Sequence, residues 1–391
     1  MQDSTSVTIE ILVKAGSVYE TKKTNWLSHF LEHMFFKWWK KYPTPKSVAE
    51  TIDAVGWEFN AFTGNDYAGY YIKSAPEHVF TALDVLSDMM VNPIFPKEEM
   101  EKEKWVVVQE IKMYEDRPDM KVLKLWDRWF LWDNSYGRPI IGPEENVLAF
   151  TQDDLFQHKH NLYTKENLLI TIAGKITDQA LLENHIATLF AGLPATGAAH
   201  IPPFAPTHPA WGTREILKQG TNQDHFVLGG LWYSYNDPEK YAARLLATIV
   251  GGTMSSRLFQ EIREKRGLCY YIWCSHQSSP EYGVFMIRAG ISKENYEQWI
   301  QALKEELTKI ANGDITEAEL QNAKGFMLGK TQVGIETSDE LADFFGAQKL
   351  LYWNIDTLDT ILEKYKSVTL ADIHRVAKKL LPENLYGYTI G

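Results

Sequence analysis

Residues 26–36 read WLSHFLEHMFF, and this stretch decides how the rest of the chain is interpreted. An α-helix turns about 100° per residue, so His29 and His33 lie about 40° apart, with Glu32 on the neighbouring edge of the same arc. Two imidazoles one turn apart can bind zinc, and a carboxylate beside them can take a proton from a coordinated water. The alternative is three polar residues on an apolar helix, each of which would need a buried partner. The pattern favours a metal site.

The composition is that of a globular protein with two domains. The chain has 391 residues, of which 45% are hydrophobic and 23% charged. Its 40 basic and 51 acidic residues give a net charge of −11, which argues against a protein that binds nucleic acid by neutralising phosphates. No apolar run approaches the length of a membrane span, and residues 1–16 lack a signal-peptide pattern. We therefore expect a cytoplasmic protein.

The two cysteines lie in an apolar run that we expect to form a strand. Cys269 and Cys274 are five positions apart, and this odd spacing predicts that they point to opposite faces. A disulfide between them is not expected.

The order of elements predicts an α+β fold made of two homologous domains, each a largely antiparallel β-sheet packed against helices. In the first half, periodicity predicts strands at 6–13 and 168–175, a hairpin turning at 64–66, and helices at 76–91, 97–115 and 178–191. Residues 192–211 contain five prolines and no carboxylate. We expect domains at 1–195 and 212–391, joined by a linker at 196–211.

The second half repeats this order without a second HxxEH motif. Strands are expected at 225–233, 269–277 and 282–291, and helices at 239–250, 256–265, 294–312 and 316–334. A duplicated fold with a single metal set suggests that the second domain serves binding or closure.

A catalytic zinc normally has three protein ligands, so the chain must supply one more. Glu110 is the best candidate, because its helical neighbours Val106, Val107, Met113 and Tyr114 predict a buried face. Glu103, two turns earlier on that face, would sit beside Glu110 and either hydrogen-bond to a metal ligand or serve as an alternative ligand. The competing interpretation of Glu110 is an acid at a helix interface, paired with a Lys or Arg.

Taken together, these motifs resemble the pitrilysin, insulysin and mitochondrial processing peptidase family of zinc metallopeptidases, the inverzincins with HxxEH. The resemblance covers nearly the whole chain, as a half-size bacterial-type subunit. It includes HFLEH at 29–33, NAFT at 60–63, the helix with Glu103 and Glu110, YGRPIIG at 136–142, and GGTMSSRLFQEIREKRGLCY at 251–270.

The resemblance implies a role for each matching residue. His29, His33 and Glu110 would hold one zinc ion per chain, and Glu32 would be the general base. The stretch Asn60, Ala61, Phe62 and Thr63 would be an edge strand on which an extended peptide lies. Arg263 would hold a substrate carbonyl, and Tyr270 would donate to the developing oxyanion. From the residues alone, a solvated helix arginine and a strand tyrosine are the simpler interpretation of this pair.

The resemblance also implies partners. The family builds a closed chamber from four such domains, and this chain has two, so we expect a homodimer, with a heterodimer as the alternative. The chamber would admit short or unfolded peptides. The expected activity is endopeptidase; the alternative is a catalytically inactive or impaired partner subunit of the same family.

Two departures from the family pattern bear on activity. Trp26, Trp38, Trp57 and Trp132 stand where the family typically has glycine, and Trp39 stands at a small-residue position. One hypothesis is a genetic code in which a triplet read here as tryptophan encodes glycine; the other is true divergence, with aromatics filling a core. An additional first strand, usual in the family, is missing, as expected if Met1 is an internal methionine and a targeting segment lies upstream.

Overall fold

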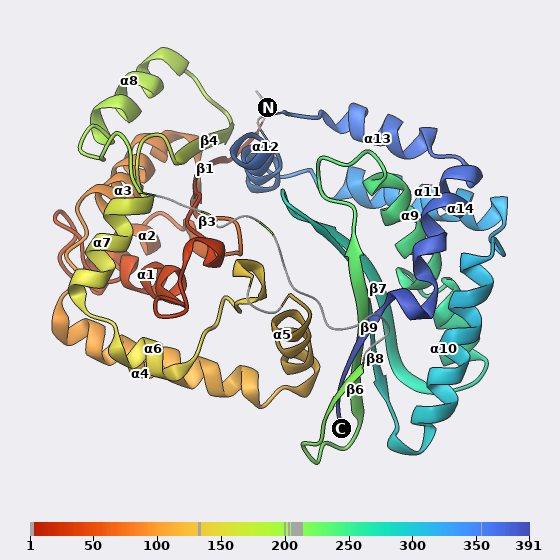
Figure 1. The fold of residues 1–391 in the computed structure, drawn as a ribbon. Helices are drawn as coiled ribbons and strands as arrows, with labels where there is room; N and C mark the ends of the chain where they lie inside the picture. Colours follow the sequence, from red (N-terminus) through yellow and green to blue (C-terminus); the bar gives the residue numbers. More distant parts are fainter. Residues whose placement is uncertain (1–3, 132–133, 199–200, 202–203, 205–213, 353) are drawn as a thin grey trace. The chain divides into compact units, whose positions relative to one another are not determined.

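The computed structural model describes residues 4–131, 134–198, 201, 204, 214–352 and 354–391 (Figure 1). The chain forms two compact units. Unit 1 contains Met1–Lys112, Arg138–Pro203 and Ile335–Ile355, and unit 2 contains Met113–Gly137, Phe204–Gly334 and Asp356–Gly391. Each unit therefore includes a short segment from the other half of the chain. The predicted linker at 196–211 lies largely outside the described residues.

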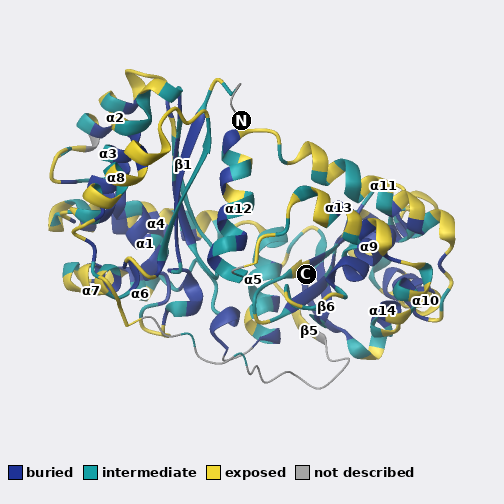
Figure 2. Ribbon diagram, turned by 90° about the horizontal axis from the view of Figure 1, so that it is seen from above, coloured by how far each residue is buried: buried dark blue, intermediate teal, exposed yellow. Residues whose placement is uncertain are grey.

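Unit 1 is built on a four-stranded antiparallel sheet with the order β2-β3-β1-β4. The strands are β1 (Val7–Val13), β2 (Glu58–Thr63), β3 (Ala68–Ser74) and β4 (Leu168–Gly174). Every residue of β1 is buried, because it has a strand on each side and helices on both faces (Figure 2). Among the described residues, β2 pairs on one side only, so its other side is an open edge.

Helices cover both faces of this sheet. On one face, Ile9 and Ile11 of β1 share a core with Phe30 and Leu31 of the motif helix and with Leu83. The α-helices that contribute to unit 1 are α1 (Leu27–Phe35), α2 (Pro45–Asp53), α3 (Val79–Val91), α4 (Lys97–Glu115), α6 (Glu144–Ala149), α7 (Gln152–Leu162), α8 (Gln179–Leu189) and α12 (Ser338–Tyr352).

Helix α12 packs on the other face of the sheet, against β1 and β4 (Figure 1). Gly346 marks a close approach, since a Cβ there would lie 2.7 Å from Thr171 Oγ1 and 2.8 Å from Leu12 Cδ1. Glu10 of β1 lies under the same helix and is 3% exposed, and its Oε2 has no hydrogen-bond partner among the described residues. Burial, followed by the negative charge of Asp343, raises the pKa of Glu10 to about 8.

Unit 2 carries a five-stranded sheet with the order β5-β9-β6-β8-β7. The strands are β5 (Arg214–Leu217), β6 (Asp224–Trp232), β7 (Cys269–Ser278), β8 (Gly283–Ile291) and β9 (Tyr386–Ile390). β5 and β9 are parallel, and the other neighbours are antiparallel. The predicted α+β fold, with largely antiparallel sheets packed against helices, is confirmed.

The helices of unit 2 include one from the first half of the chain. In α5 (Pro118–Phe130), the indole N–H of Trp126 donates to the carbonyl oxygen of Tyr386 in β9 at 2.9 Å. The expected helix at 256–265 contains a π-helix, Phe259–Glu264. The remaining α-helices are α9 (Lys240–Gly251), α10 (Tyr296–Ala311), α11 (Glu317–Val333), α13 (Leu358–Ser367) and α14 (Leu370–Ala377).

A β-bulge places the side chains of the two cysteines on the same face of β7. The pairing of β7 with β8 shifts between Cys269 and Tyr271. The extra residue, Tyr270, changes the parity of the strand, so Cys269 and Cys274 both join the core of unit 2. Both thiols are free. The prediction that they point to opposite faces is therefore wrong.

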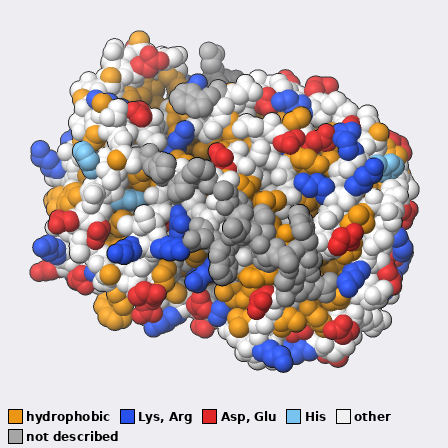
Figure 3. Space-filling view, viewed as in Figure 1, with side chains coloured by type: hydrophobic (Ala, Val, Ile, Leu, Met, Phe, Trp, Pro, Cys, Tyr) orange, Lys and Arg blue, Asp and Glu red, His pale blue; other side chains and the backbone are white. Residues whose placement is uncertain are grey.

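The hydropathy of the described helices bears on membrane insertion. Among the described residues, no helix combines the length and apolar character that crossing a bilayer requires. On the face that Figure 3 shows, acidic and basic side chains of the described residues are interspersed.

Candidate metal centre

A buried glutamate fixes the start of the motif helix α1. The carboxylate of Glu20 accepts hydrogen bonds from the backbone N–H groups of Trp26 (2.8 Å) and Ser28 (2.7 Å). The first N–H groups of a helix lack partners inside it, and a negative charge at this end is favourable. Burial outweighs these bonds and raises the pKa of Glu20 to about 7. Glu20 belongs to no motif, so sequence reasoning missed it.

The two histidines project from one face of α1. The ring centroids of His29 and His33 are 4.8 Å apart. Phe30, Leu31 and Met34 are fully buried in the core of unit 1. The core therefore fixes the orientation of the helix, and this orientation brings both imidazoles to the same side.

Glu110 of α4 comes close to both histidines. Its Oε2 lies 3.5 Å from Nε2 of His33, and one ligand atom from each of His29, His33 and Glu110 lies within 4.8 Å of the others. The predicted buried face of Glu110 needs correction, because Val106 is 53% exposed and Met113 is 54% exposed. The face of α4 beside Glu110 is therefore partly open to solvent.

The ligand atoms of His29, His33 and Glu110 are of the types that bind zinc, and the distances between them are close to those that a zinc ion requires. Two imidazole nitrogens and one carboxylate oxygen are usual zinc ligands, at about 2.0–2.2 Å from the ion. Tetrahedral ligands at that distance lie about 3.4 Å apart. His33 and Glu110 already have this separation, whereas the full set spans up to 4.8 Å. Zinc binding therefore requires the three residues to draw closer together.

Glu103 holds His33 in place. Its Oε1 lies 2.9 Å from Nδ1 of His33, and its Oε2 lies 2.6 Å from Nζ of Lys37. Burial by itself raises the pKa of Glu103, but the bonds from His33 and Lys37 prevail and lower it. Burial lowers the pKa of His33, but Glu103 and the nearby acids outweigh it and raise that pKa. With Nδ1–H donating to Glu103, Nε2 of His33 is left for a metal.

Glu32 lies beside the two histidines and is bonded to strand β2. The hydroxyl of Thr63 donates to Oε2 of Glu32 at 2.5 Å. Burial raises the pKa of Glu32, although the bond from Thr63 and the charge of His33 lower it. A carboxylate with a raised pKa, next to a candidate metal site, is suited to accept and return a proton.

The stretch from Asn60 to Thr63 lies in β2, on the open edge of the sheet. Edge strands expose backbone groups that can pair with an added strand. The backbone N–H of Ala61 donates to the side-chain Oδ1 of Asn60 at 2.9 Å. Thr63 is the last residue of β2, so its hydroxyl links this edge to Glu32.

Trp26 has an unusual backbone and touches His29. Its φ of 87° lies in the left-handed region, where a residue with a Cβ costs about 1–2 kcal/mol. Its indole N–H donates to Nδ1 of His29 at 2.5 Å, and the two rings are stacked. Burial, and then the charge of His33, lower the pKa of His29 to about 3.

The other unusual tryptophans differ from Trp26. Trp38, Trp39 and Trp57 do not have positive φ. The indole nitrogens of Trp38 and Trp57 are buried and have no hydrogen-bond partner in the part of the chain that the structure describes, whereas that of Trp39 donates to the carbonyl oxygen of Phe35. Trp132 lies outside the described residues.

Arg263 and Tyr270 belong to unit 2, at two irregularities of the backbone. Arg263 lies in the π-helix, with its guanidinium carbon 4.4 Å from the centre of the Phe259 ring. Tyr270 is the extra residue of the β7 bulge and is 73% exposed. π-Helices and bulges often occur at functional sites, where they redirect a side chain.

A second missed residue supports α1 from behind. His158 of α7 is buried, with its Nε2 3.0 Å from the hydroxyl of Ser28. Burial lowers its pKa to about 4. This burial follows from the packing of α7 against α1.

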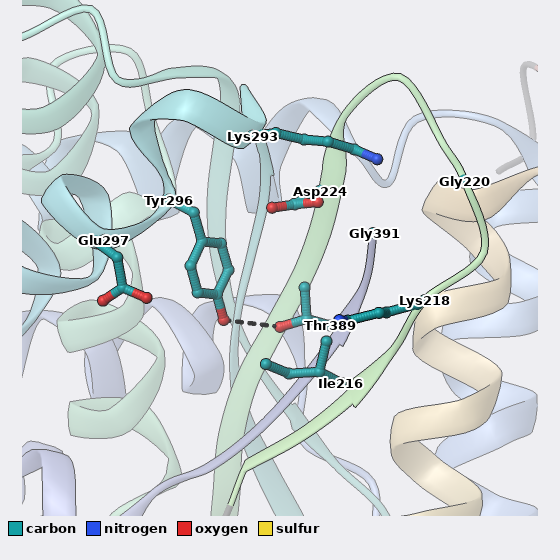
Figure 4. Close-up of a pocket in the computed structure, with 9 residues that line it drawn as sticks. All are labelled: Ile216, Lys218, Gly220, Asp224, Lys293, Tyr296, Glu297, Thr389 and Gly391. Atoms are coloured by element: carbon teal, nitrogen blue, oxygen red, sulfur yellow. Dashed lines mark hydrogen bonds between the residues drawn. The ribbon is translucent and has the colours of Figure 1, made fainter.

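Unit 2 has a pocket that is separate from these residues (Figure 4). In it, Tyr296 bonds the hydroxyl of Thr389 at 3.1 Å, beside Lys293 and Asp224. None of its lining residues belongs to the predicted site.

Comparisons with known proteins agree with the motifs. A family model described as Insulinase (Peptidase family M16) matches residues 1–144, and one described as Peptidase M16 inactive domain matches residues 149–326. The chain is 35% identical to the uncharacterized zinc protease YmxG of Bacillus subtilis, over 97% of this chain and 91% of the relative. It is 32% identical to an uncharacterized zinc protease of Streptomyces coelicolor, over 96% and 83%.

Solved structures show the same fold. A protease from Helicobacter pylori matches with a TM-score of 0.89 and 21% identity, covering 99% of this chain and 95% of that one. A Peptidase M16 inactive domain from Pseudomonas fluorescens matches with a TM-score of 0.91 and 18% identity, covering 100% and 93%. The identity to YmxG over almost the whole chain, together with the two family matches, establishes that this chain belongs to peptidase family M16, the insulinase family.

Proposed function

We propose that this chain is a zinc-dependent endopeptidase that cleaves short or unfolded peptides. The observation that carries the proposal is the convergence of His29, His33 and Glu110, with Glu32 on the same helix as the two histidines. The names of the relatives, which are called zinc proteases, support it.

In this proposal, His29, His33 and Glu110 hold one zinc ion, which would lower the pKa of a water and polarise the scissile carbonyl. Glu32 accepts a proton from the attacking water and passes it to the leaving amine. Its burial and raised pKa suit both steps, and Thr63 keeps the carboxylate oriented. Glu103 keeps Nε2 of His33 available.

The substrate peptide lies along the open edge of β2, from Asn60 to Thr63. Backbone pairing binds an extended peptide without reading its sequence, so the enzyme accepts varied peptides. A folded protein cannot offer such a segment. The backbone N–H of Ala61 donates to the side chain of Asn60, and a bound peptide would replace that side chain as the acceptor.

Arg263 and Tyr270 complete the reaction by binding a substrate carbonyl and the developing oxyanion. We propose that a homodimer supplies this pair in trans, because two domains per chain would make a four-domain chamber from two chains. A heterodimer would supply it equally well if the partner carried the same pair.

One observation favours a second candidate, an impaired or inactive partner subunit. Trp26 places a strained backbone at the start of α1 and a hydrogen bond on His29. A chain in which His29, His33 and Glu110 cannot draw close enough to bind zinc would keep the fold and lose the activity.

Cleavage of quenched, unstructured peptides tests the proposal. The purified chain with zinc should cleave them, and Glu32→Gln should not, although both bind zinc equally. Cleavage by both would remove Glu32 from its role, and no cleavage by a zinc-loaded wild-type chain would favour the partner subunit.

A further inference from the structure

We infer that Trp26 is a positioning residue that controls the metal affinity of this centre, because its indole N–H occupies the acceptor lone pair on Nδ1 of His29. The inference rests on the proposed function, since it takes His29 as a ligand.

The hydrogen bond from Trp26 leaves His29 without a free lone pair. In a neutral imidazole one ring nitrogen carries a proton and the other accepts. Nδ1 of His29 accepts from the indole N–H, so the proton is on Nε2. A metal can bind neither nitrogen until the indole bond breaks, which either frees Nδ1 or lets the proton move from Nε2 to Nδ1.

His33 shows the opposite arrangement, within the same helix. Its Nδ1 faces the carboxylate of Glu103, which can only accept, so Nδ1 carries a proton and Nε2 faces Glu110. One ligand is therefore prepared for a metal by its neighbour, and the other is occupied by its neighbour.

The indole cannot easily leave His29. Trp26 is fully buried in the core of unit 1. Its backbone N–H donates a hydrogen bond to Glu20. This bond also helps to fix the backbone of Trp26 at its φ of 87°. A glycine at this position would adopt that φ without strain and would carry no indole. The residue at position 26 therefore decides how much rearrangement zinc binding requires.

The test compares zinc affinity, by competition with a chromophoric chelator, in the wild-type chain, Trp26→Phe, Trp26→Gly and Trp39→Phe. Trp26→Phe removes the N–H donor and keeps a buried ring, and Trp39→Phe removes another buried indole donor, whose acceptor is a backbone carbonyl. Replacing a residue that hydrogen-bonds to a metal-binding histidine typically changes the metal affinity by about 10- to 100-fold. We expect both Trp26 variants to bind zinc tighter by that factor, and Trp39→Phe to match the wild type.

The outcomes separate the inference from the proposed function. Equal affinity in all four chains would overturn the inference and leave the metal site standing, as would a gain in Trp26→Gly alone, which would assign the effect to the backbone. No zinc binding by any chain would overturn the site as well.

A spectroscopic measurement needs no variant. In the zinc-free wild-type chain, 15N chemical shifts of His29 should show the proton on Nε2 and an acceptor at Nδ1. A proton on Nδ1 would overturn the inference.

Discussion

The hydroxyl of Thr63 donates a hydrogen bond to Oε2 of Glu32, which joins the last residue of the edge strand β2 to the carboxylate beside both histidines. A peptide that pairs with β2 would therefore lie next to the proposed general base. In the proposed function, substrate positioning and proton transfer would share this contact.

Replacing Thr63 with Val should impair the base. The bond stabilises the charged form of Glu32, so its loss raises the pKa of that carboxyl. The acid limb of kcat/KM should move to higher pH, and activity below that limb should fall by about 10-fold, the effect of one hydrogen bond to a charged group. Thr63→Ser keeps the hydroxyl and should restore the profile. An unchanged acid limb in Thr63→Val would contradict this role.

Replacing Glu103 with Gln should weaken zinc binding by about 10- to 100-fold, because the neutral amide no longer holds Nδ1–H of His33 with a charge. Chelator competition measures the change. Glu99→Gln is the matched control, since Glu99 is on the same helix and pairs with the exposed Lys102. Equal affinity in the two variants would show that Glu103 does not orient His33.

Removing the hydroxyl of Tyr270 tests its proposed oxyanion contact. Tyr270→Phe should lower kcat by about 10²- to 10³-fold with little change in KM, because the contact forms only in the transition state. Tyr271→Phe is the control, since Tyr271 is the next residue and its hydroxyl lies 3.3 Å from Nδ1 of His225. If both variants keep full activity, Tyr270 is only a surface residue.

Glu10 should make the protein less stable as the pH rises. Its pKa is about 8 in the folded chain, because of burial and the charges of Asp343 and Asp339, against 4.5 ordinarily. Between these values the folded state keeps a proton that the unfolded state releases, so the free energy of unfolding falls as pH increases, by at most about 1.4 kcal/mol per pH unit.

Chemical denaturation from pH 5 to pH 9 measures this dependence. Glu10→Gln should flatten the curve and gain stability over the wild type at the alkaline end. Glu363→Gln, which changes an exposed carboxylate on α13, should follow the wild-type curve. Parallel curves for wild type and Glu10→Gln would assign the titration to other groups.

Local patterns predicted most elements, but not the features that depend on partners distant in sequence. Periodicity placed β1, α3 and α4 within a few residues, because one face of each is apolar. It could not reveal the bulge at Tyr270, since one inserted residue reverses the facing of the residues on either side. It also could not show which side of Glu110 is open, because exposure there depends on what packs beside α4.

In the candidate metal centre, too, local features could be predicted and contacts between distant segments could not. The spacing of His29 and His33 is a property of one helix and could be predicted. The support from Glu20 and His158 comes from other segments that carry no motif. The positive φ of Trp26 and its bond to His29 depend on contacts with other side chains, so the sequence pattern could not predict them.

The placement of α12 has a consequence for synthesis of the chain. The sheet of unit 1 is complete once Gly174 has been made, but the helix that covers its second face begins at Ser338. The nascent chain therefore carries an uncovered sheet face, with Leu12 and Glu10 on it, while most of unit 2 is still being translated. Native packing of the first half of the chain is therefore completed only after Ser338–Tyr352 of the second half has been synthesised.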